Sequence, residues 1–422
     1  MKYLYALISL LLFIGCQNSG SDKTPPSVSK TQMGTPIRSG YPFYLANGEI
    51  KWFNGIKMLF NTTSPNEYNE TAKFSYEGFK KAIDFASSKK YFSLWFVKEW
   101  FDEGTPEEWY EWSDIQKAMN EGKIPVLIFY YFGDSLTQMP SRDEIEDYYR
   151  AADTFANHIS KLQGEKIIII EPEFNKNFII NDENKSKTMA DIFSNAIDII
   201  KSKVKNAKFS LCMMDTGKRD ADKTYKECGY KNCALGDKSE WIRSQSVYKY
   251  LLNKIDFISF QEMVSQFSRN PSSPGTQEHP NLIHYTNTQI GIDYLEKRVE
   301  NLSEFLKNTY KKPVFLAYIA IASGTWNDKN LNGRIDEGEF DKDGWNDKIY
   351  NFYTQMEQNQ KNLYEKGLIA YIPFALIDDP QHDINGWQFF NKNEYHLGLI
   401  KTSAKDEEKA LYGDLKFKAD IR

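Results

Sequence analysis

Short apolar runs alternate with longer amphipathic stretches along most of this chain, and this alternation limits the possible folds more than any other feature of the sequence. Eight such runs follow residue 55, and several are almost continuous in Ile, Val, Leu, Phe and Tyr, which is typical of parallel strands buried on both faces. The eight predicted strands are 56–60, 91–97, 124–132, 166–171, 209–213, 257–260, 314–321 and 369–377.

The stretches between these runs have helical spacing. Ser141 and Glu144 form a capping-box pattern that opens a helix predicted to reach about Leu162, and the predicted helix over 347–366 is followed by Gly367 as a stop. Strand followed by helix, eight times over, predicts an α/β fold, a single (β/α)8 TIM barrel. An open doubly wound sheet is the alternative, but no Gly-rich turn follows the first strand.

The N-terminus has the features of an export signal. Lys2 precedes an apolar run over 3–14, which is shorter than the roughly 20 residues that a membrane-spanning helix needs. The run ends in Phe13-Ile14-Gly15-Cys16, which resembles the bacterial lipobox; the resemblance implies that Cys16 becomes the acylated (palmitate-bearing) mature N-terminus. An ordinary signal peptide with an incidental cysteine is the alternative.

Three segments follow from this interpretation: a lipoprotein signal peptide at 1–15, a flexible tether at 16–40 and the barrel at 41–422. The tether is polar, with too few large apolar residues to order itself. We therefore expect an extracytoplasmic protein, lipid-anchored to the bacterial membrane. The outer membrane or cell surface is preferred, because Gln17 gives no retention cue of the Asp type.

The composition limits the kinds of molecule that this protein is expected to bind. The net charge is −5 and no basic patch occurs, which argues against nucleic acid. The aromatic content of 15% suits a site that stacks on sugar faces. Export permits a disulfide, expected between Cys228 and Cys233, whereas Cys212 lies in an apolar run and no zinc-site spacing is present. We expect a monomer that contacts the membrane only through its anchor.

The strongest candidate for chemistry follows the fourth run, where Glu171-Pro172-Glu173 ends an apolar strand. Function in such barrels lies at the C-terminal ends of the strands. Glu171 and Glu173 share strand parity, so both are expected on one side, where each raises the pKa of the other and one serves as a general acid. The alternative is structural: Glu173 in solvent and Glu171 paired with a base.

Other strand ends add acids and aromatics to the same rim. Glu262 follows the sixth run and is a third catalytic candidate, with Gln261 beside it to bind a sugar hydroxyl. Two carboxylates flanking an acetal oxygen, with aromatic platforms around them, are the machinery of glycoside hydrolysis. The predicted substrate-binding residues are Tyr130, Tyr131, Asp215, Gln261, Asp378, Asp379, His382 and Trp387.

Over roughly residues 50 to 400 this layout resembles the (β/α)8-barrel glycoside hydrolases. Their largest clan has an acid/base Glu after strand 4 and a nucleophile Glu after strand 7; the run at 314–321 is followed instead by Ala322-Ser323-Gly324. The chitinase-like and lysozyme-like barrels, with two acids two residues apart on strand 4, are the closer resemblance. It implies that Glu173 is the proton donor and Glu171 tunes it, while Glu262, Glu171 or a substrate acetamido group completes the chemistry.

The predicted function is therefore a glycoside hydrolase acting on a polysaccharide or glycan. A non-catalytic, carbohydrate-binding surface lipoprotein on a degenerate barrel is the main alternative, and a barrel hydrolase of another polymer is a third possibility.

A second motif predicts a metal site. Residues 328–339 match the EF-hand loop, in which oxygen ligands at fixed spacing suit Ca²⁺ and a Gly at position 6, here Gly333, allows the turn. Because no second copy and no preceding helix occur, we expect a structural ion that stiffens the loop after the seventh strand. The predicted ligands are Asp328, Asn330, Asn332, Arg334 (through its carbonyl), Asp336 and Glu339.

Overall fold

A computed structural model describes the following parts of the chain: residues 32–33, 90–98, 101, 112–213, 245–264, 267–269, 282–284, 292–293, 295–326, 337–341, 343–377, 397–401 and 416–417. The predicted signal peptide, Cys16, the first strand at 56–60 and the pair Cys228 and Cys233 lie outside the described residues and stay predictions. No helix among the described residues is long and apolar enough to cross a membrane.

One eight-stranded sheet forms the centre of the protein, with the order β1-β12-β9-β6-β5-β4-β3-β2 and parallel pairing throughout. β1 (Gln32–Met33) is short, pairs with β12 and comes from the segment predicted as a tether. The other seven strands correspond to the second to eighth predicted runs: β2 (Tyr91–Val97), β3 (Ile124–Tyr130), β4 (Lys166–Ile170), β5 (Ala207–Met213), β6 (Ile258–Val264), β9 (Val314–Ile321) and β12 (Leu368–Pro373).

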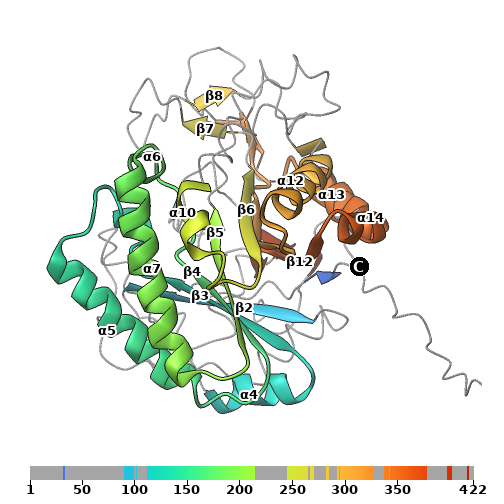
Figure 1. Ribbon diagram of the computed structural model, residues 1–422. Coiled ribbons are helices and arrows are strands. Elements are labelled where there is room, and N and C mark those ends of the chain that lie inside the picture. The colour runs from blue at the N-terminus through green and yellow to red at the C-terminus, as the bar shows by residue number, and fades with distance from the viewer. Residues whose placement is uncertain are drawn as a thin grey trace, which may run out of the picture.

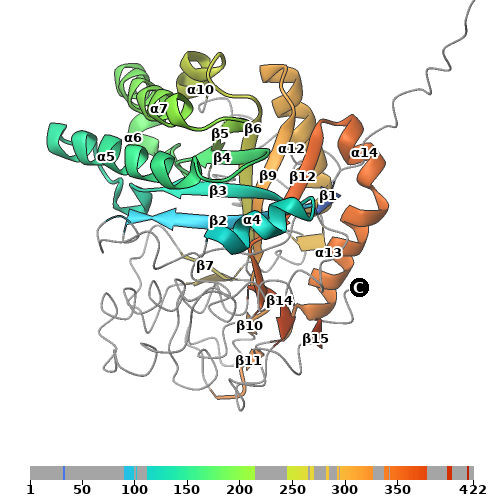
Figure 2. The ribbon, with the colours of Figure 1, turned by 90° about the horizontal axis from the view of Figure 1, so that it is seen from below.

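The sheet curls so that β2 and β9 approach each other across an interior. The rings of Tyr91 on β2 and Phe315 on β9 lie 5.6 Å apart, and those of Trp95 and Tyr318 on the same two strands lie 5.1 Å apart. β2 and β9 are not neighbours in the sheet, so these contacts span the interior; Figure 2 shows the curved sheet with helices outside it. The α/β (β/α)8 fold predicted from the sequence is confirmed.

Helices cover the outside of the sheet (Figure 1). The capping box of Ser141 and Glu144 is present at the start of α5 (Arg142–Ile159), as predicted. The helix predicted over 347–366 is divided in two at Asn359, whose side chain turns to Glu296 and Glu300 on a neighbouring helix. Among the described residues the helices are α4 (Trp112–Asn120), α5 (Arg142–Ile159), α6 (Asn177–Ile180), α7 (Glu183–Lys203), α10 (Gln245–Leu251), α12 (Leu295–Tyr310), α13 (Asn346–Gln358) and α14 (Gln360–Glu365).

Short strands lie beyond the carboxyl ends of the barrel strands. β7 (Phe267–Arg269) pairs with β8 (Leu282–His284), and β10 (Thr325–Trp326) pairs with β11 (Phe340–Asp341). A third small sheet joins β13 (Ala375–Ile377), β14 (Gly398–Lys401) and β15 (Lys416–Phe417). β7, β10 and β13 directly follow β6, β9 and β12 in the chain, so these sheets mark the end of the barrel at which function is expected.

Candidate active site

The chain leaves β4 through a strained turn. β4 ends at Ile170, and Glu171 and Glu173 then adopt φ angles of 44° and 65°. Residues other than Gly rarely take these left-handed backbone conformations, and Pro172, between the two glutamates, limits the backbone further. Strain of this kind persists only where the surroundings hold it, and it gathers at functional sites.

Three contacts hold this turn. The N–H of Glu171 donates to the carbonyl of Phe129 on β3 at 2.8 Å, and the N–H of Glu173 donates to the carbonyl of Cys212 on β5 at 2.9 Å. Phe174 is completely buried, with its ring 5.3 Å from that of Tyr248 on α10. The turn is therefore fixed to both neighbouring strands and to the helix layer.

The carboxyl group of Glu171 is turned onto the backbone that follows β3. It is 1% exposed and accepts hydrogen bonds from the N–H groups of Tyr131 at 3.0 Å and Phe132 at 3.3 Å. Burial raises the pKa of Glu171 to about 8, although the same N–H groups and that of Gly133 act to lower it. Strand alternation, which predicted that Glu171 and Glu173 share a side, ends at Ile170, and the two carboxyl groups have separate partners.

Glu171 is expected to make the protein less stable as pH rises from about 5 to about 8. Its pKa is near 4.5 in the unfolded chain and about 8 in the folded protein, so the folded state binds more protons in this window. Its stabilising contribution is complete below about pH 4.5 and is lost as pH rises through about 8, with a slope approaching about 1.4 kcal/mol per pH unit. Urea unfolding at several pH values measures this slope, and Glu171→Gln is expected to flatten it. An equally steep slope in the variant contradicts the assignment.

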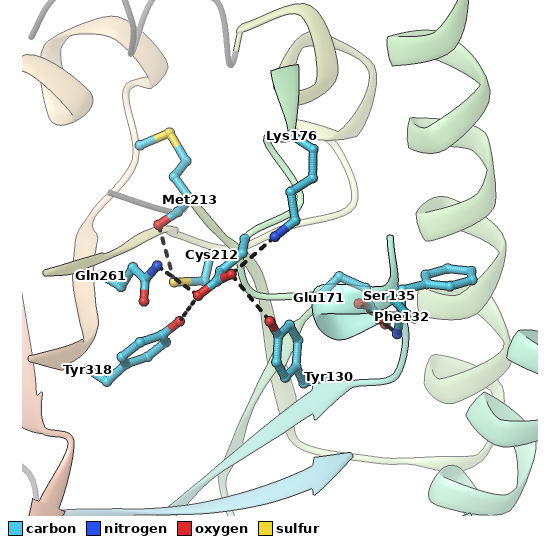
Figure 3. A network of polar contacts seen from close by, with 10 residues as sticks. Tyr130, Phe132, Ser135, Glu171, Lys176, Cys212, Met213, Gln261 and Tyr318 are labelled. Atoms are coloured by element: carbon cyan, nitrogen blue, oxygen red, sulfur yellow. Dashed lines mark hydrogen bonds and ion pairs between the residues drawn. The ribbon is translucent and has the colours of Figure 1, made fainter. Parts of the chain in front are cut away.

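Glu173 is the centre of a polar cluster. Its Oε1 accepts hydrogen bonds from Nε2 of Gln261 at 3.1 Å and from the hydroxyl of Tyr318 at 3.5 Å. Its Oε2 accepts from the hydroxyl of Tyr130 at 3.3 Å and forms an ion pair with Nζ of Lys176 at 3.2 Å. Figure 3 shows these four side chains converging on one carboxylate from β3, β6, β9 and the turn after β4.

An aromatic wall stands beside this cluster on the barrel interior. The ring of Trp95 on β2 lies 5.7 Å from Tyr130, 5.1 Å from Tyr318 and 5.9 Å from Phe374. Edge-to-face contacts of this kind restrain the rings, so the two tyrosine hydroxyls are held in place toward Glu173. The side chain of Glu173 keeps 15% of its surface exposed.

Two other predicted site residues lie elsewhere. Glu262, adjacent to Gln261 on β6, points to the opposite face of the strand and forms an ion pair with Arg298 on α12, where both side chains are almost fully buried. Tyr131 is 6% exposed and packs against Tyr148 on α5, in the layer between sheet and helices. The structure thus brings Tyr130, Gln261 and Glu173 together and separates Glu262 and Tyr131 from them.

The remaining predicted substrate-binding residues lie outside the described part of the chain: Asp215 after β5, and Asp378, Asp379, His382 and Trp387 after β13. The predicted calcium ligands Asp328, Asn330, Asn332, Arg334 and Asp336 also lie outside it, whereas Glu339 is described. Conversely, Tyr318, Lys176 and Trp95 belong to the site but were not predicted from the sequence. Tyr318 and Trp95 were hidden inside apolar runs, and Lys176 had only its position three residues after Glu173 as a signal.

The sequence matches no protein-family model and no curated protein. Among solved structures, the chain is similar to the family 1 β-glucosidase of Thermotoga maritima, with 13% identity, a TM-score of 0.48 and coverage of 91% of this chain and 96% of the other. The β-glucosidase of Thermotoga maritima in complex with deoxynojirimycin gives 12% identity, a TM-score of 0.49 and coverage of 92% and 97%. Because these identities and TM-scores are low, the fold assignment depends instead on the strand order and ring contacts of the chain itself.

Proposed function

We propose that this protein is a glycoside hydrolase acting on a polysaccharide or glycan, with Glu173 as a catalytic carboxylate. One observation carries the proposal: a partly exposed carboxylate at the C-terminal end of the barrel is surrounded by donors from three other strands, β3, β6 and β9, and by Lys176 of its own turn. An active site requires polar groups from distant parts of the chain to converge in this way, whereas packing alone does not require it.

The contacts of Glu173 favour the role of a nucleophile or charge-stabilising carboxylate over the role of a proton donor. The neighbouring groups Tyr130, Tyr318, Gln261 and Lys176 all donate to it, and the ammonium of Lys176 forms an ion pair with it. This arrangement suits an ionised carboxylate that attacks the anomeric carbon or stabilises the positive charge that develops there. We therefore propose this role for Glu173 in place of the proton-donor role predicted from the sequence.

The second carboxylate must then come from another strand end. Glu171 and Glu262 are both buried and already bound to backbone N–H groups or to Arg298, so neither is available to a sugar. We propose that the proton donor is one of Asp215, Asp378 and Asp379, which follow β5 and β13 in the chain. The experiment that identifies it is the set of single Asp→Asn variants, in which the donor variant keeps activity only on substrates with good leaving groups.

Hydrolysis measurements across a panel of polysaccharides and aryl glycosides test the proposed function. Release of a reducing sugar or of the aryl group by the purified protein supports it, and the product identifies the sugar. Binding of sugars with no hydrolysis of any of them supports the alternative, a non-catalytic carbohydrate-binding lipoprotein on the same barrel.

We also propose that residues 328–339 bind a structural Ca²⁺ ion. The support is the oxygen-ligand spacing of the sequence together with the structure at its margins. β10 and β11 pair Trp326 with Phe340, which brings the two ends of the segment together, and Glu339 at the twelfth position is 6% exposed. Because β9 carries Tyr318 and leads directly into β10, an ion here would stiffen the connection beside Glu173.

Calcium titration of the purified protein by calorimetry tests this site. We expect about one ion per chain, and Glu339→Gln is expected to weaken binding at least about tenfold because it removes a charged ligand of a hard cation. Glu337→Gln is the matched control: Glu337 is exposed, lies in the same segment at the tenth position and is not a predicted ligand. No binding to the wild type, or equal losses in both variants, contradicts the proposal.

A further inference from the structure

The side-chain amide of Gln261 has one satisfied end and one unsatisfied end. Its nitrogen donates to Oε1 of Glu173 at 3.1 Å, whereas its oxygen is buried and has no hydrogen-bond partner among the described residues. Gln261 as a whole is 2% exposed. Buried polar atoms are nearly always paired, so an unpaired acceptor beside a catalytic carboxylate indicates a donor that arrives with a ligand or a water.

The orientation of this amide is fixed by its surroundings. The pairing of β6 with β9 shifts between Phe260 and Gln261, which sets Gln261 opposite Tyr318, and both side chains donate to the same oxygen of Glu173. Irregularities of this kind re-aim side chains near active sites. An ionised carboxylate only accepts, so the nitrogen of the amide must face Glu173 and the oxygen must face away from it.

We infer that the side-chain oxygen of Gln261 accepts a hydrogen bond from the substrate, from a hydroxyl or an acetamido N–H on the carbon next to the anomeric carbon. This inference rests on the proposed function, in which Glu173 faces the anomeric carbon. The nitrogen and the oxygen of the amide are bonded to the same carbon atom, so the oxygen lies close to the carboxylate that the nitrogen contacts. A sugar group that donates to this oxygen is therefore one or two bonds away from the anomeric carbon that Glu173 faces. Gln261 is thereby a residue that selects sugars with a donor at this position.

The consequence is discrimination against sugars that lack the donor. A 2-deoxy sugar leaves the buried oxygen of Gln261 unpaired in the transition state, whereas the natural sugar satisfies it. The preference is measured as the kcat/KM for the aryl glycoside divided by the kcat/KM for its 2-deoxy counterpart. This ratio is expected to be about 10- to 100-fold higher in the wild type than in a protein without this acceptor.

The test compares this preference in the wild type, Gln261→Met and Tyr318→Phe, with the p-nitrophenyl glycoside that gives the highest rate and its 2-deoxy counterpart. Gln261→Met is expected to lose the preference, because methionine keeps the shape and removes the acceptor. Tyr318→Phe is the matched control: it also removes a donor to Oε1 of Glu173, so it is expected to lower both rates and keep their ratio. Substitution of either residue can lower the overall rate, but only the first should change the ratio.

An unchanged ratio in Gln261→Met overturns the inference and assigns the buried oxygen to a bound water. Absence of hydrolysis in the wild type overturns the proposed function instead. In that case, calorimetric binding of methyl glycosides and their 2-deoxy counterparts to the wild type and Gln261→Met tests Gln261 separately. Equal affinities of the wild type for a glycoside and its 2-deoxy counterpart overturn the inference.

Discussion

Replacing Glu173 by Gln is expected to reduce glycoside hydrolysis by about 10³-fold or more while leaving the protein folded. Gln keeps the size of the side chain and one acceptor oxygen, but it carries no charge and cannot attack or stabilise a developing cation. The hydroxyls of Tyr130 and Tyr318 and the ammonium of Lys176 are then left without the carboxylate that they contact. The measurement is kcat/KM on the best substrate of the panel, with the thermal unfolding midpoint recorded for the same sample.

Glu165→Gln is the matched control for this variant. Glu165 immediately precedes β4, at the opposite end of the barrel from Glu173, and forms an exposed ion pair with Lys208 at 2.9 Å. Exposed pairs contribute about 0 to 1 kcal/mol, so this variant is expected to keep both activity and stability. Near wild-type activity in Glu173→Gln would remove Glu173 from the chemistry, and an equal loss in both variants would show a general effect of altering β4.

Replacing Arg298 by Met is expected to destabilise the protein by about 3–5 kcal/mol. Arg298 on α12 and Glu262 on β6 form an ion pair, with side chains 2% and 0% exposed. Loss of the guanidinium leaves the carboxylate of Glu262 buried between the sheet and the helix without this ion pair, and the cost of this loss is far larger than the stabilisation that the packing of Met provides. The free energy of unfolding from urea titration measures the effect.

Two companion variants show whether the buried charge is the cause. Adding Glu262→Leu to Arg298→Met is expected to recover most of the lost stability, because replacing both partners with apolar residues leaves no charge behind. Glu304→Gln is the control on the same helix, since Glu304 is 44% exposed in its pair with Lys366, which is 29% exposed, and loss of this pair should cost at most about 1 kcal/mol. Hydrolysis by the double variant also tests whether Glu262 has a catalytic role, and loss of activity in a stable protein would contradict its structural assignment.

The barrel was predictable because its strands are buried on both faces. The runs at 91–97 and 314–321 are almost wholly apolar, and their predicted limits coincide with those of β2 and β9. The start of α5 was predictable for a different reason, since its capping box is a local pattern that needs no tertiary contact. The short strand β1 could not be predicted, because two residues pair with β12 within a stretch whose polar composition indicates no structure.

The site was only partly predictable because it is assembled from distant segments. Position at a strand end identified Glu173, Tyr130 and Gln261, which the structure brings together. Strand parity did not predict the direction of the Glu171 side chain, because alternation applies only while the backbone is extended and φ is positive at Glu171 and again at Glu173. Tyr318 is separated from Glu173 by 145 positions, a contact that no local pattern in one sequence can indicate.

The central claim, that the carboxylate of Glu173 faces the anomeric carbon, is tested most directly by the leaving-group dependence of Glu173→Ala. The loss in kcat/KM is measured on two aryl glycosides of the same sugar, one with a strongly acidic phenol and one with a weakly acidic phenol. A carboxylate that acts at the anomeric carbon is needed whatever the leaving group, so the predicted result is a similar loss of about 10³-fold on both. A loss confined to the weakly acidic phenol would contradict the claim, because it is the behaviour of the residue that protonates the leaving group.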